Sequence, residues 1–180
     1  MNYLSTEDYI DKILFLGLSQ SGKTSIIQVV FEGILPESTL KNQATGRIKK
    51  KKIDFSGKIV SVFEVGGQIP FLDDSLSKFK ESVYSNVKNF VFVVDSSQRH
   101  QFLKALVYYN QACLLVREYN KEANIFIFAH KIDLVAEEEK SEILNEIESV
   151  FNVGHTFNSV MFTTSIYDET IYEALSSIEV

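Results

Sequence analysis

The sequence predicts an α/β fold in which helices cover both faces of a mostly parallel sheet. Short apolar runs alternate along the chain with longer segments whose apolar residues recur at helical spacing, and such alternation favours parallel strands joined by helical crossovers. One tight turn between two strand-like segments adds a single antiparallel hairpin. These observations together predict six strands. Four of them, buried on both faces, are Ile13–Leu16, Phe90–Asp95, Ile125–Ala129 and Val160–Thr163.

The hairpin and the helices follow from local patterns. The hairpin runs through Ile48–Phe55, a Ser56-Gly57 turn and Ile59–Val65, after the first buried strand. Asp168 is the expected N-cap of the last helix. Four apolar stripes mark the helices: Leu72, Leu76, Phe79 and Val83; Phe102, Leu106, Tyr109 and Cys113; Ile143, Ile147 and Val150; and Ile171, Ala174, Leu175 and Ile178.

Composition indicates one compact domain over residues 1–180. The chain is 45% hydrophobic with two prolines, and it has no internal repeat or linker. A net charge of −6 argues against a nucleic-acid partner. The single cysteine, Cys113, cannot form an internal disulfide and suits the core of a protein in a reducing compartment. Neither end carries a signal, myristoylation or prenylation pattern, so we expect a cytoplasmic protein without a direct membrane anchor.

A phosphate-binding loop follows the first strand. Gly17-Leu18-Ser19-Gln20-Ser21-Gly22-Lys23-Thr24 fits G-x-x-x-x-G-K-[ST] at every fixed position. Its glycines let the backbone approach phosphate, and the helix that begins after it adds the positive end of its dipole. Lys23 is expected to reach the β- and γ-phosphates, and the Thr24 hydroxyl to bind Mg²⁺. The sequence therefore predicts a nucleoside triphosphate as ligand.

A carboxylate after the third buried strand indicates which base is bound. In Ala129-His130-Lys131-Ile132-Asp133, the side chain of Asp133 can accept both hydrogens of a guanine edge. Adenine offers neither, and it would leave the carboxylate desolvated and unpaired. After the last strand, Thr164-Ser165-Ile166 has a backbone N–H for the guanine carbonyl.

The segment Phe63-Glu64-Val65-Gly66-Gly67-Gln68 has the residues of a hydrolytic switch. Glu64 can hold Mg²⁺ through water, the Gly67 N–H can reach a γ-phosphate, and Gln68 can orient the attacking water. Thr45, 19 positions before Glu64, is expected to bind Mg²⁺ and the γ-phosphate. Thr39 is the alternative, farther from the hairpin.

This ordered set of motifs resembles the Ras-superfamily GTPases. His130-Lys131-Ile132-Asp133 and the Thr164–Ala174 segment are similar to the Rag/Gtr branch, over about residues 10 to 179. The resemblance implies a P-loop NTPase G domain that binds GTP or GDP with Mg²⁺. It implies Gln68 and Lys23 as catalytic residues, and Thr24, Thr45 and Glu64, the last through water, as metal ligands. The implied nucleotide-binding residues are Ser19, Gln20, Ser21, Gly22, Lys23, Thr24, Ser25, Thr45, Gly67, His130, Lys131, Asp133, Ser165 and Ile166.

Several residues depart from that superfamily. Glu64 replaces an aspartate, Ser19 occupies a position often held by glycine, and Ile166 stands where many relatives have a lysine. His130 replaces the usual asparagine, although this is the residue of the Rag branch. Arg47 is the only arginine near these motifs. Rag proteins normally continue into a roadblock-type dimerisation domain. The sequence stops at Val180, so we expect either a natural single-domain relative or an excised G domain.

Two functions remain open at this stage. The first is a switch that hydrolyses GTP slowly unless a partner supplies an arginine. The second is a scaffold that stays bound to nucleotide and hardly hydrolyses it, which Glu64 and Ser19 favour. The resemblance implies regulators of the GAP and GEF type, a Rag-like heterodimer or roadblock-domain partner, and recruitment to a membrane by partners. Ile69-Pro70-Phe71 is a candidate partner contact, whereas Lys49–Lys52 is expected to be a solvated edge strand.

Overall fold

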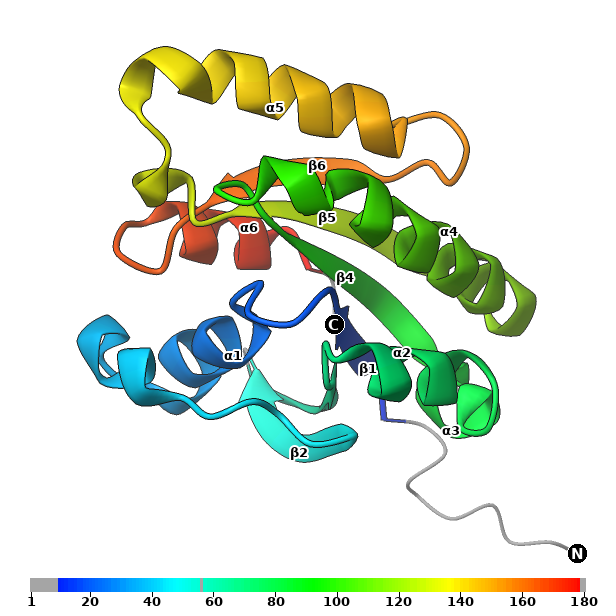
Figure 1. The fold of residues 1–180 in the computed structure, drawn as a ribbon. Helices are drawn as coiled ribbons and strands as arrows, with labels where there is room; N and C mark the ends of the chain where they lie inside the picture. The colour runs from blue at the N-terminus through cyan, green and yellow to red at the C-terminus, as the bar shows by residue number, and fades with distance from the viewer. Residues whose placement is uncertain (1–9, 56, 179–180) are drawn as a thin grey trace, which may run out of the picture.

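The computed structural model describes residues 10–55 and 57–178 (Figure 1). Residues 1–9, Ser56 and residues 179–180 lie outside the described part of the chain. The predictions about the N-terminus, the last two C-terminal residues and the first residue of the hairpin turn therefore also lie outside it. A six-stranded sheet has the strand order β2-β3-β1-β4-β5-β6. The strands are β1 (Lys12–Leu16), β2 (Ile48–Phe55), β3 (Lys58–Val65), β4 (Val87–Asp95), β5 (Asn124–His130) and β6 (Val160–Thr164). Only β2 and β3 pair antiparallel, as predicted.

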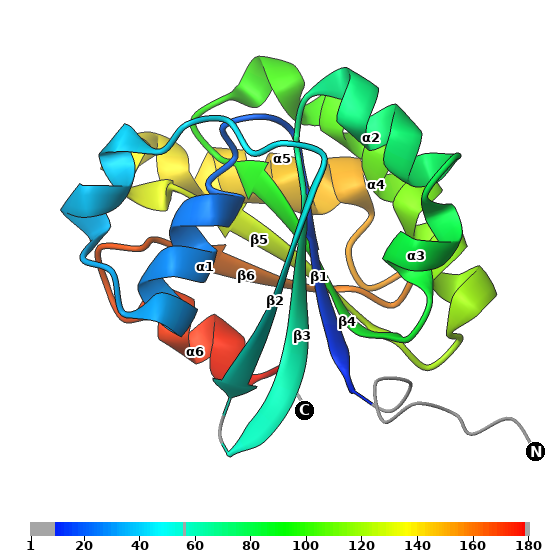
Figure 2. The same cartoon turned by 90° about the horizontal axis from the view of Figure 1, so that it is seen from below.

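Helices cover both faces of this sheet, so the predicted fold class is confirmed (Figures 1 and 2). The α-helices are α1 (Lys23–Glu32), α2 (Ile69–Leu76), α3 (Lys80–Tyr84), α4 (Phe102–Tyr119), α5 (Glu137–Phe151) and α6 (Thr170–Ser176). Within the described residues, three 3₁₀ turns lie between these elements: η2 (Pro36–Lys41), η3 (Arg99–Gln101) and η4 (Ile132–Leu134). Helices α1 and α6 cover one face, and α2 to α5 cover the other.

Alternating side chains of the central strand β1 divide the core into two layers. Leu14 and Leu16 pack towards the face with α4 and α5, and Ile13 and Phe15 pack towards α1 and α6. All four are fully buried, which explains why β1 reads as a continuous apolar run. Cys113 is buried in the first layer, as predicted.

The apolar stripe Leu72, Leu76, Phe79 and Val83 does not lie on one helix, which corrects the sequence-based expectation. α2 ends at Leu76 and α3 begins at Lys80. The Ser77 hydroxyl donates to the carbonyl of Asp73 at 2.7 Å, and the Phe79 N–H donates to the carbonyl of Asp74 at 2.9 Å. A side-chain bond of this kind competes with helical pairing, so the helix stops while its apolar residues still face the core.

The start of α6 lies one residue later than predicted. Glu169 is the N-cap by position, but the Asp168 carboxylate accepts the N–H of Thr170 at 3.0 Å and also bonds its hydroxyl. Asp168 therefore satisfies a free N–H at this helix end, as expected of a capping side chain.

The chain reverses its direction of winding at β1, whose neighbours are β3 on one side and β4 on the other. In open α/β sheets, ligands bind outside the carboxyl ends of the strands at such a point. Gly17 to Gly22 follow the carboxyl end of β1, so the fold puts the predicted phosphate loop there.

Candidate nucleotide-binding site

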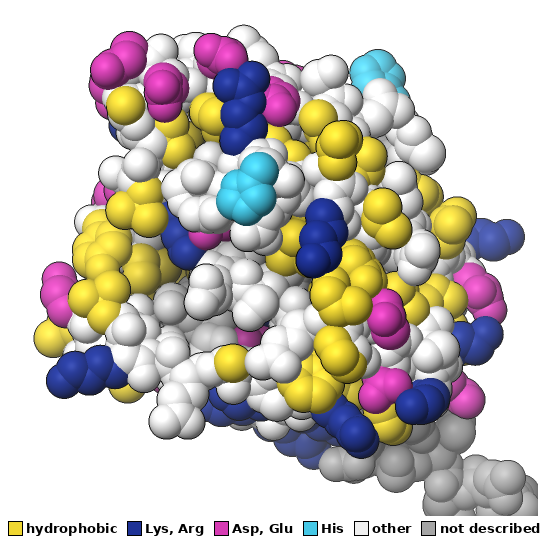
Figure 3. Space-filling view, viewed as in Figure 1, with side chains coloured by type: hydrophobic (Ala, Val, Ile, Leu, Met, Phe, Trp, Pro, Cys, Tyr) yellow, Lys and Arg dark blue, Asp and Glu magenta, His cyan; other side chains and the backbone are white. Residues whose placement is uncertain are grey.

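A cavity of about 420 Å³ lies at this edge of the sheet. Figure 3 shows the face of the molecule in the orientation of Figure 1, with a hollow near its centre. The phosphate loop, the segment before β2, the end of β3 and the loops after β5 and β6 all contribute to its wall. The site residues predicted from the sequence that line this cavity are Ser19, Gln20, Gly22, Lys23, Thr24, Ser25, Thr45, Glu64, Gly67, Gln68, His130, Lys131, Asp133 and Ile166.

Lys23 is held inside the phosphate loop. Its ammonium donates to the carbonyls of Gly17 at 2.8 Å and Leu18 at 2.9 Å, and to the Ser21 hydroxyl at 3.3 Å. The residue is only 5% exposed. Burial lowers the pKa of Lys23 to about 8, a shift that the negative charge of Glu64 opposes and the positive charge of Lys131 reinforces. A bound anion would therefore compensate a desolvated cation.

Three oxygen-bearing side chains from separate elements meet beside Lys23. The hydroxyls of Thr24 and Thr45 lie 2.8 Å apart, and the Thr45 hydroxyl donates to Glu64 Oε1 at 2.8 Å. The Thr24 hydroxyl also donates to the same carboxylate oxygen. Thr24 is the second residue of α1, Thr45 precedes β2, and Glu64 lies near the end of β3.

These oxygens fit a magnesium ion. Mg²⁺ prefers hard oxygen ligands, and neighbouring ligands of its octahedron at 2.0–2.1 Å lie about 3 Å from one another. Among residues 10–55 and 57–178, no group of three His, Cys, Asp or Glu side chains forms a metal site. A cation here would depend on the two hydroxyls, Glu64 and the phosphates of the ligand.

The structure favours Thr45 over Thr39 for this role. The Thr39 hydroxyl donates to the carbonyl of Pro36 at 2.8 Å, within η2. Thr39 lines the cavity, but its hydroxyl is committed to the turn, whereas that of Thr45 faces Thr24 and Glu64.

Two glycines allow the segments around the cavity to touch. A Cβ on Gly67 would overlap the backbone of Leu18 and Ser19, so the loop after β3 lies directly against the phosphate loop. A Cβ on Gly22, which has φ +103°, would overlap the ring of His130. Both positions require the absence of a side chain.

The last residue of β5, His130, and the residue after it, Lys131, contact the phosphate loop. His130 is 1% exposed, and its Nδ1 lies 2.9 Å from the Thr164 hydroxyl. Burial and, after it, the charge of Lys131 lower the pKa of His130 to about 4, so the ring is neutral at pH 7. The Lys131 ammonium donates to the Gln20 carbonyl at 2.6 Å and to Asp95 Oδ2 at 2.7 Å.

Two predicted residues lie behind the cavity wall. Ser21 accepts the bond from Lys23, and Ser165 is fully buried. The Ser165 N–H donates to the Thr170 hydroxyl at 2.9 Å, so a guanine carbonyl would have to replace that hydroxyl to use this donor. Ile166, which follows, lines the cavity.

Sequence reasoning missed several residues of the cavity. They are Leu40, Asn42, Gln43, Ala44, Leu134 and Tyr167. Leu40 and Tyr167 are 75% and 49% exposed, and an exposed apolar side chain beside a cavity is suited to cover a flat ligand. No motif marks these positions. Their adjacency to Thr45, Asp133 and Ile166 was the only available signal.

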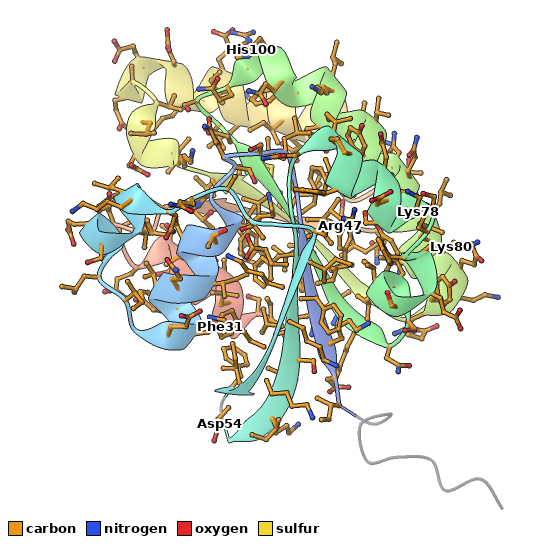
Figure 4. All side chains as sticks on the ribbon, turned by 60° about the horizontal axis from the view of Figure 1, so that its bottom comes forward. Phe31, Arg47, Asp54, Lys78, Lys80 and His100 are labelled. Atoms are coloured by element: carbon orange, nitrogen blue, oxygen red, sulfur yellow. The ribbon has the colours of Figure 1, made fainter. Side chains whose placement is uncertain are left out.

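None of the three arginines of the chain lines the cavity. Arg47 lies directly before β2 (Figure 4), and its Nε is 3.9 Å from Asp74 Oδ2 on α2. Arg99 pairs with Glu142 and Glu146, and Arg117 donates to backbone carbonyls. The structure thus directs Arg47 towards α2 and not towards a phosphate.

The chain is similar to known GTP-binding proteins over most of its length. The protein-family model described as "Gtr1/RagA G protein conserved region" matches residues 12–179. The chain belongs to this family. Among curated Gtr1/RagA relatives, it is 31% identical over 170 residues to Ras-related GTP-binding protein A of Dictyostelium discoideum, covering 93% of this chain and 56% of that protein. It is 30% identical over 175 residues to GTP-binding protein GTR1 of Saccharomyces cerevisiae, covering 93% and 55%.

The chain spans about half the length of these Gtr1/RagA relatives. A solved structure supports the fold. The Arl6 BBS3 small GTPase from Trypanosoma brucei, with bound nucleotide analogue GppNp, matches with a TM-score of 0.64 and 21% identity over 92% of this chain and 93% of that one. Within the described residues, no helix is both long and apolar enough to cross a membrane.

Proposed function

We propose that this chain provides a G domain that binds GTP or GDP with Mg²⁺ and acts as a molecular switch with slow intrinsic hydrolysis. The observation that carries the proposal is the meeting of Thr24, Thr45 and Glu64 beside the phosphate loop. These side chains belong to three segments that a triphosphate and its metal would hold together. The names of these relatives describe them as GTP-binding proteins, which agrees with this proposal.

Asp133 is the residue that selects guanine. It lines the cavity together with Lys131, Leu134 and Ile166, which come from the loops after β5 and β6. A purine placed there would present its edge to the carboxylate. Guanine donates two hydrogens at that edge and adenine donates neither, so the preference follows from one side chain.

The chemistry proposed is attack of water on the γ-phosphate. Mg²⁺, when bound, neutralises charge on the β- and γ-phosphate oxygens. Lys23 stabilises the same oxygens with its ammonium, because it lies within the phosphate loop. Gln68, an exposed residue at the N-cap of α2, orients the water, and Gly67 brings it against the loop.

Turnover of the isolated chain is expected to be slow. None of its arginines faces the cavity, and small GTPases without a supplied arginine turn over at roughly 10⁻³ s⁻¹ or less. A partner of the GAP type would supply the missing charge. The family resemblance adds GEF-type regulators, a heterodimer or roadblock-domain partner, and a cytoplasmic chain recruited to membranes by partners as proposals of the same kind.

A constitutively bound scaffold is the second candidate, and one observation favours it. The carboxylate of Glu64, longer than aspartate by one methylene, bonds both Thr24 and Thr45 directly. The segments can therefore stay together through protein contacts alone. A switch requires that loss of the γ-phosphate release them.

Phosphate release from GTP, measured in a single turnover with Mg²⁺, separates the two. The switch predicts slow release by the wild-type chain, acceleration by a cognate activating partner, and loss of release in Gln68→Leu. The matched control Gln111→Leu, on the exposed side of α4, should release phosphate at the wild-type rate. Tight GTP binding without release, alone and with every partner, would support the scaffold. Equal rates for Gln68→Leu and wild type would remove Gln68 from the mechanism.

A further inference from the structure

A bonded chain of side chains crosses from the end of β4 to the phosphate loop. Asp95, the last residue of β4, accepts the Lys131 ammonium at 2.7 Å through Oδ2. Its other oxygen accepts the Ser97 N–H at 3.0 Å and the Ser97 hydroxyl at 2.6 Å. Lys131 continues the chain to the carbonyl of Gln20 at 2.6 Å. Asp95 is thus fixed by Ser97, and it fixes Lys131 in turn.

The two segments joined by this chain both have unusual backbone conformations. Gln20 has φ +64° and Lys131 has φ +61°, in the left-handed region that residues with side chains seldom adopt. Such conformations persist where surrounding contacts hold them. The bond between the Lys131 ammonium and the Gln20 carbonyl is such a contact, and it ties each segment to the other.

The bonded residues also separate two cavities. Gln20 and Lys131 line the nucleotide cavity and a second cavity of about 140 Å³, which Asp95 and Ser97 line as well. The side chains of Asp95 and Lys131 are 11% and 27% exposed. A lysine without its carboxylate partner would have room to leave Gln20 for the second cavity or for solvent.

We propose that Asp95 is a positioning residue that slows nucleotide release by holding Lys131 on the phosphate loop. The inference rests on the proposed binding of guanine nucleotide. The phosphate loop and the loop containing Asp133 hold opposite ends of that ligand, and the Asp95–Lys131–Gln20 chain fixes one loop relative to the other. Without the carboxylate, the two loops separate more easily and the ligand leaves faster. Asp95 acts through Lys131 and does not touch the nucleotide.

The test is the dissociation rate of GDP with a fluorescent group on its ribose, chased with excess GDP in the presence of Mg²⁺. Asp95→Ala should dissociate about ten to a hundred times faster than wild type, because a charge-assisted hydrogen bond is lost from a largely buried site. Asp95→Asn, which can still accept from Ser97, should give a smaller increase. The matched control is Asp11→Ala: Asp11 pairs with Lys88 at 2.9 Å before β1, at the opposite end of that strand, and its removal should leave the rate unchanged.

A double-mutant cycle distinguishes positioning from a general loss of structure. If Asp95 acts through Lys131, adding Asp95→Ala to Lys131→Ala should produce no further acceleration. A multiplied effect in the double variant, or a wild-type rate in Asp95→Ala, would overturn the inference while nucleotide binding stands. A wild-type chain that takes up no labelled GDP would instead overturn the proposed function, and the inference with it.

Discussion

His130, the last residue of β5, is a buried neutral imidazole between the phosphate loop and the end of β6. Its ring occupies the space that the missing side chain of Gly22 leaves free, and its Nδ1 faces Thr164. An asparagine at this position would be shorter and would leave part of that space unfilled. The histidine therefore packs against the phosphate loop and hydrogen-bonds to the end of β6, and it introduces a titratable group into the core.

We predict that His130 makes the chain less stable in mild acid. Its pKa is lowered from 6.5 to about 4 in the folded chain, so between these values the unfolded chain binds a proton that the native ring excludes. The free energy of unfolding should fall as pH drops from about 6.5 to 4, by about 3 kcal/mol in total. Urea denaturation at a series of pH values measures this.

His130→Asn should reduce that pH dependence, and His100→Asn should retain it, because His100 is exposed on η3 (Figure 4). The same slope for all three proteins would show that other groups cause the acid sensitivity.

Base selection should depend on Asp133 alone. Asp133→Asn removes an acceptor for guanine and supplies a donor for the extra carbonyl of xanthine. We expect the ratio of GDP to xanthosine diphosphate affinity to fall by about tenfold or more. Competition against a fluorescent nucleotide measures the ratio, with Asp54→Asn on the distant hairpin as control. An unchanged ratio in Asp133→Asn would mean that another group selects the base.

Among the elements, the segment from Glu64, near the end of β3, to Gln68, the N-cap of α2, is closely constrained by its neighbours. Gly66 packs against the backbone of Thr45 and Gly46 and donates its N–H to the carbonyl of Arg47 at 2.9 Å. Gly67 packs against the phosphate loop. This segment thereby contacts both the residues before β2 and the phosphate loop. Its position should therefore depend on which nucleotide the cavity holds.

Gly67→Ala should disrupt this arrangement, because the added Cβ would overlap the backbone of Leu18 and Ser19, which cannot move aside as a side chain can. We expect weaker GTP binding relative to GDP and slower single-turnover hydrolysis. Gly46→Ala, in the neighbouring segment, adds its Cβ where no atom lies within 4 Å and is the matched control. Equal losses in both variants would point to general loop strain.

The elements that sequence could predict are those with a local signal. β1 reads as a buried strand because every residue of Ile13–Leu16 is apolar, and the phosphate loop is defined by the spacing of its glycines and Lys23. The break between α2 and α3 was missed because Leu72 to Val83 keep helical spacing across it. The hydrogen bonds that cause the break are donated by Ser77 and Phe79. The identity of these two residues does not by itself predict such bonds.

The residues of the site also differ in whether the sequence alone could predict them. Thr24, Glu64 and Asp133 could be predicted from motif spacing, whereas Asp95 could not, because its partner lies 36 positions later in the chain. Leu40 and Tyr167 reach the cavity only through the folded paths of η2 and the loop after β6. η2 itself has no apolar periodicity in Pro36–Lys41 that would have revealed it.

At the scale of the whole molecule, the lysine-rich edge strand β2 and the cavity at the carboxyl ends of the strands have different roles. Lys49 to Lys52 are exposed on β2, the edge strand, as predicted, and Lys51 pairs with Glu32 of α1. Lysines on an open edge discourage pairing with other strands. The cavity lies at the carboxyl ends of the strands, where loops from both halves of the sheet meet. A ligand held there contacts segments from nearly the whole length of the chain.

Isothermal calorimetry with magnesium present tests the central claim most directly. The account predicts that the chain binds GDP and GTP at one site each, and that ATP produces no comparable heat, because Asp133 is left unpaired by adenine. Absence of guanine-nucleotide binding, or equal affinity for ATP and GTP, would contradict it.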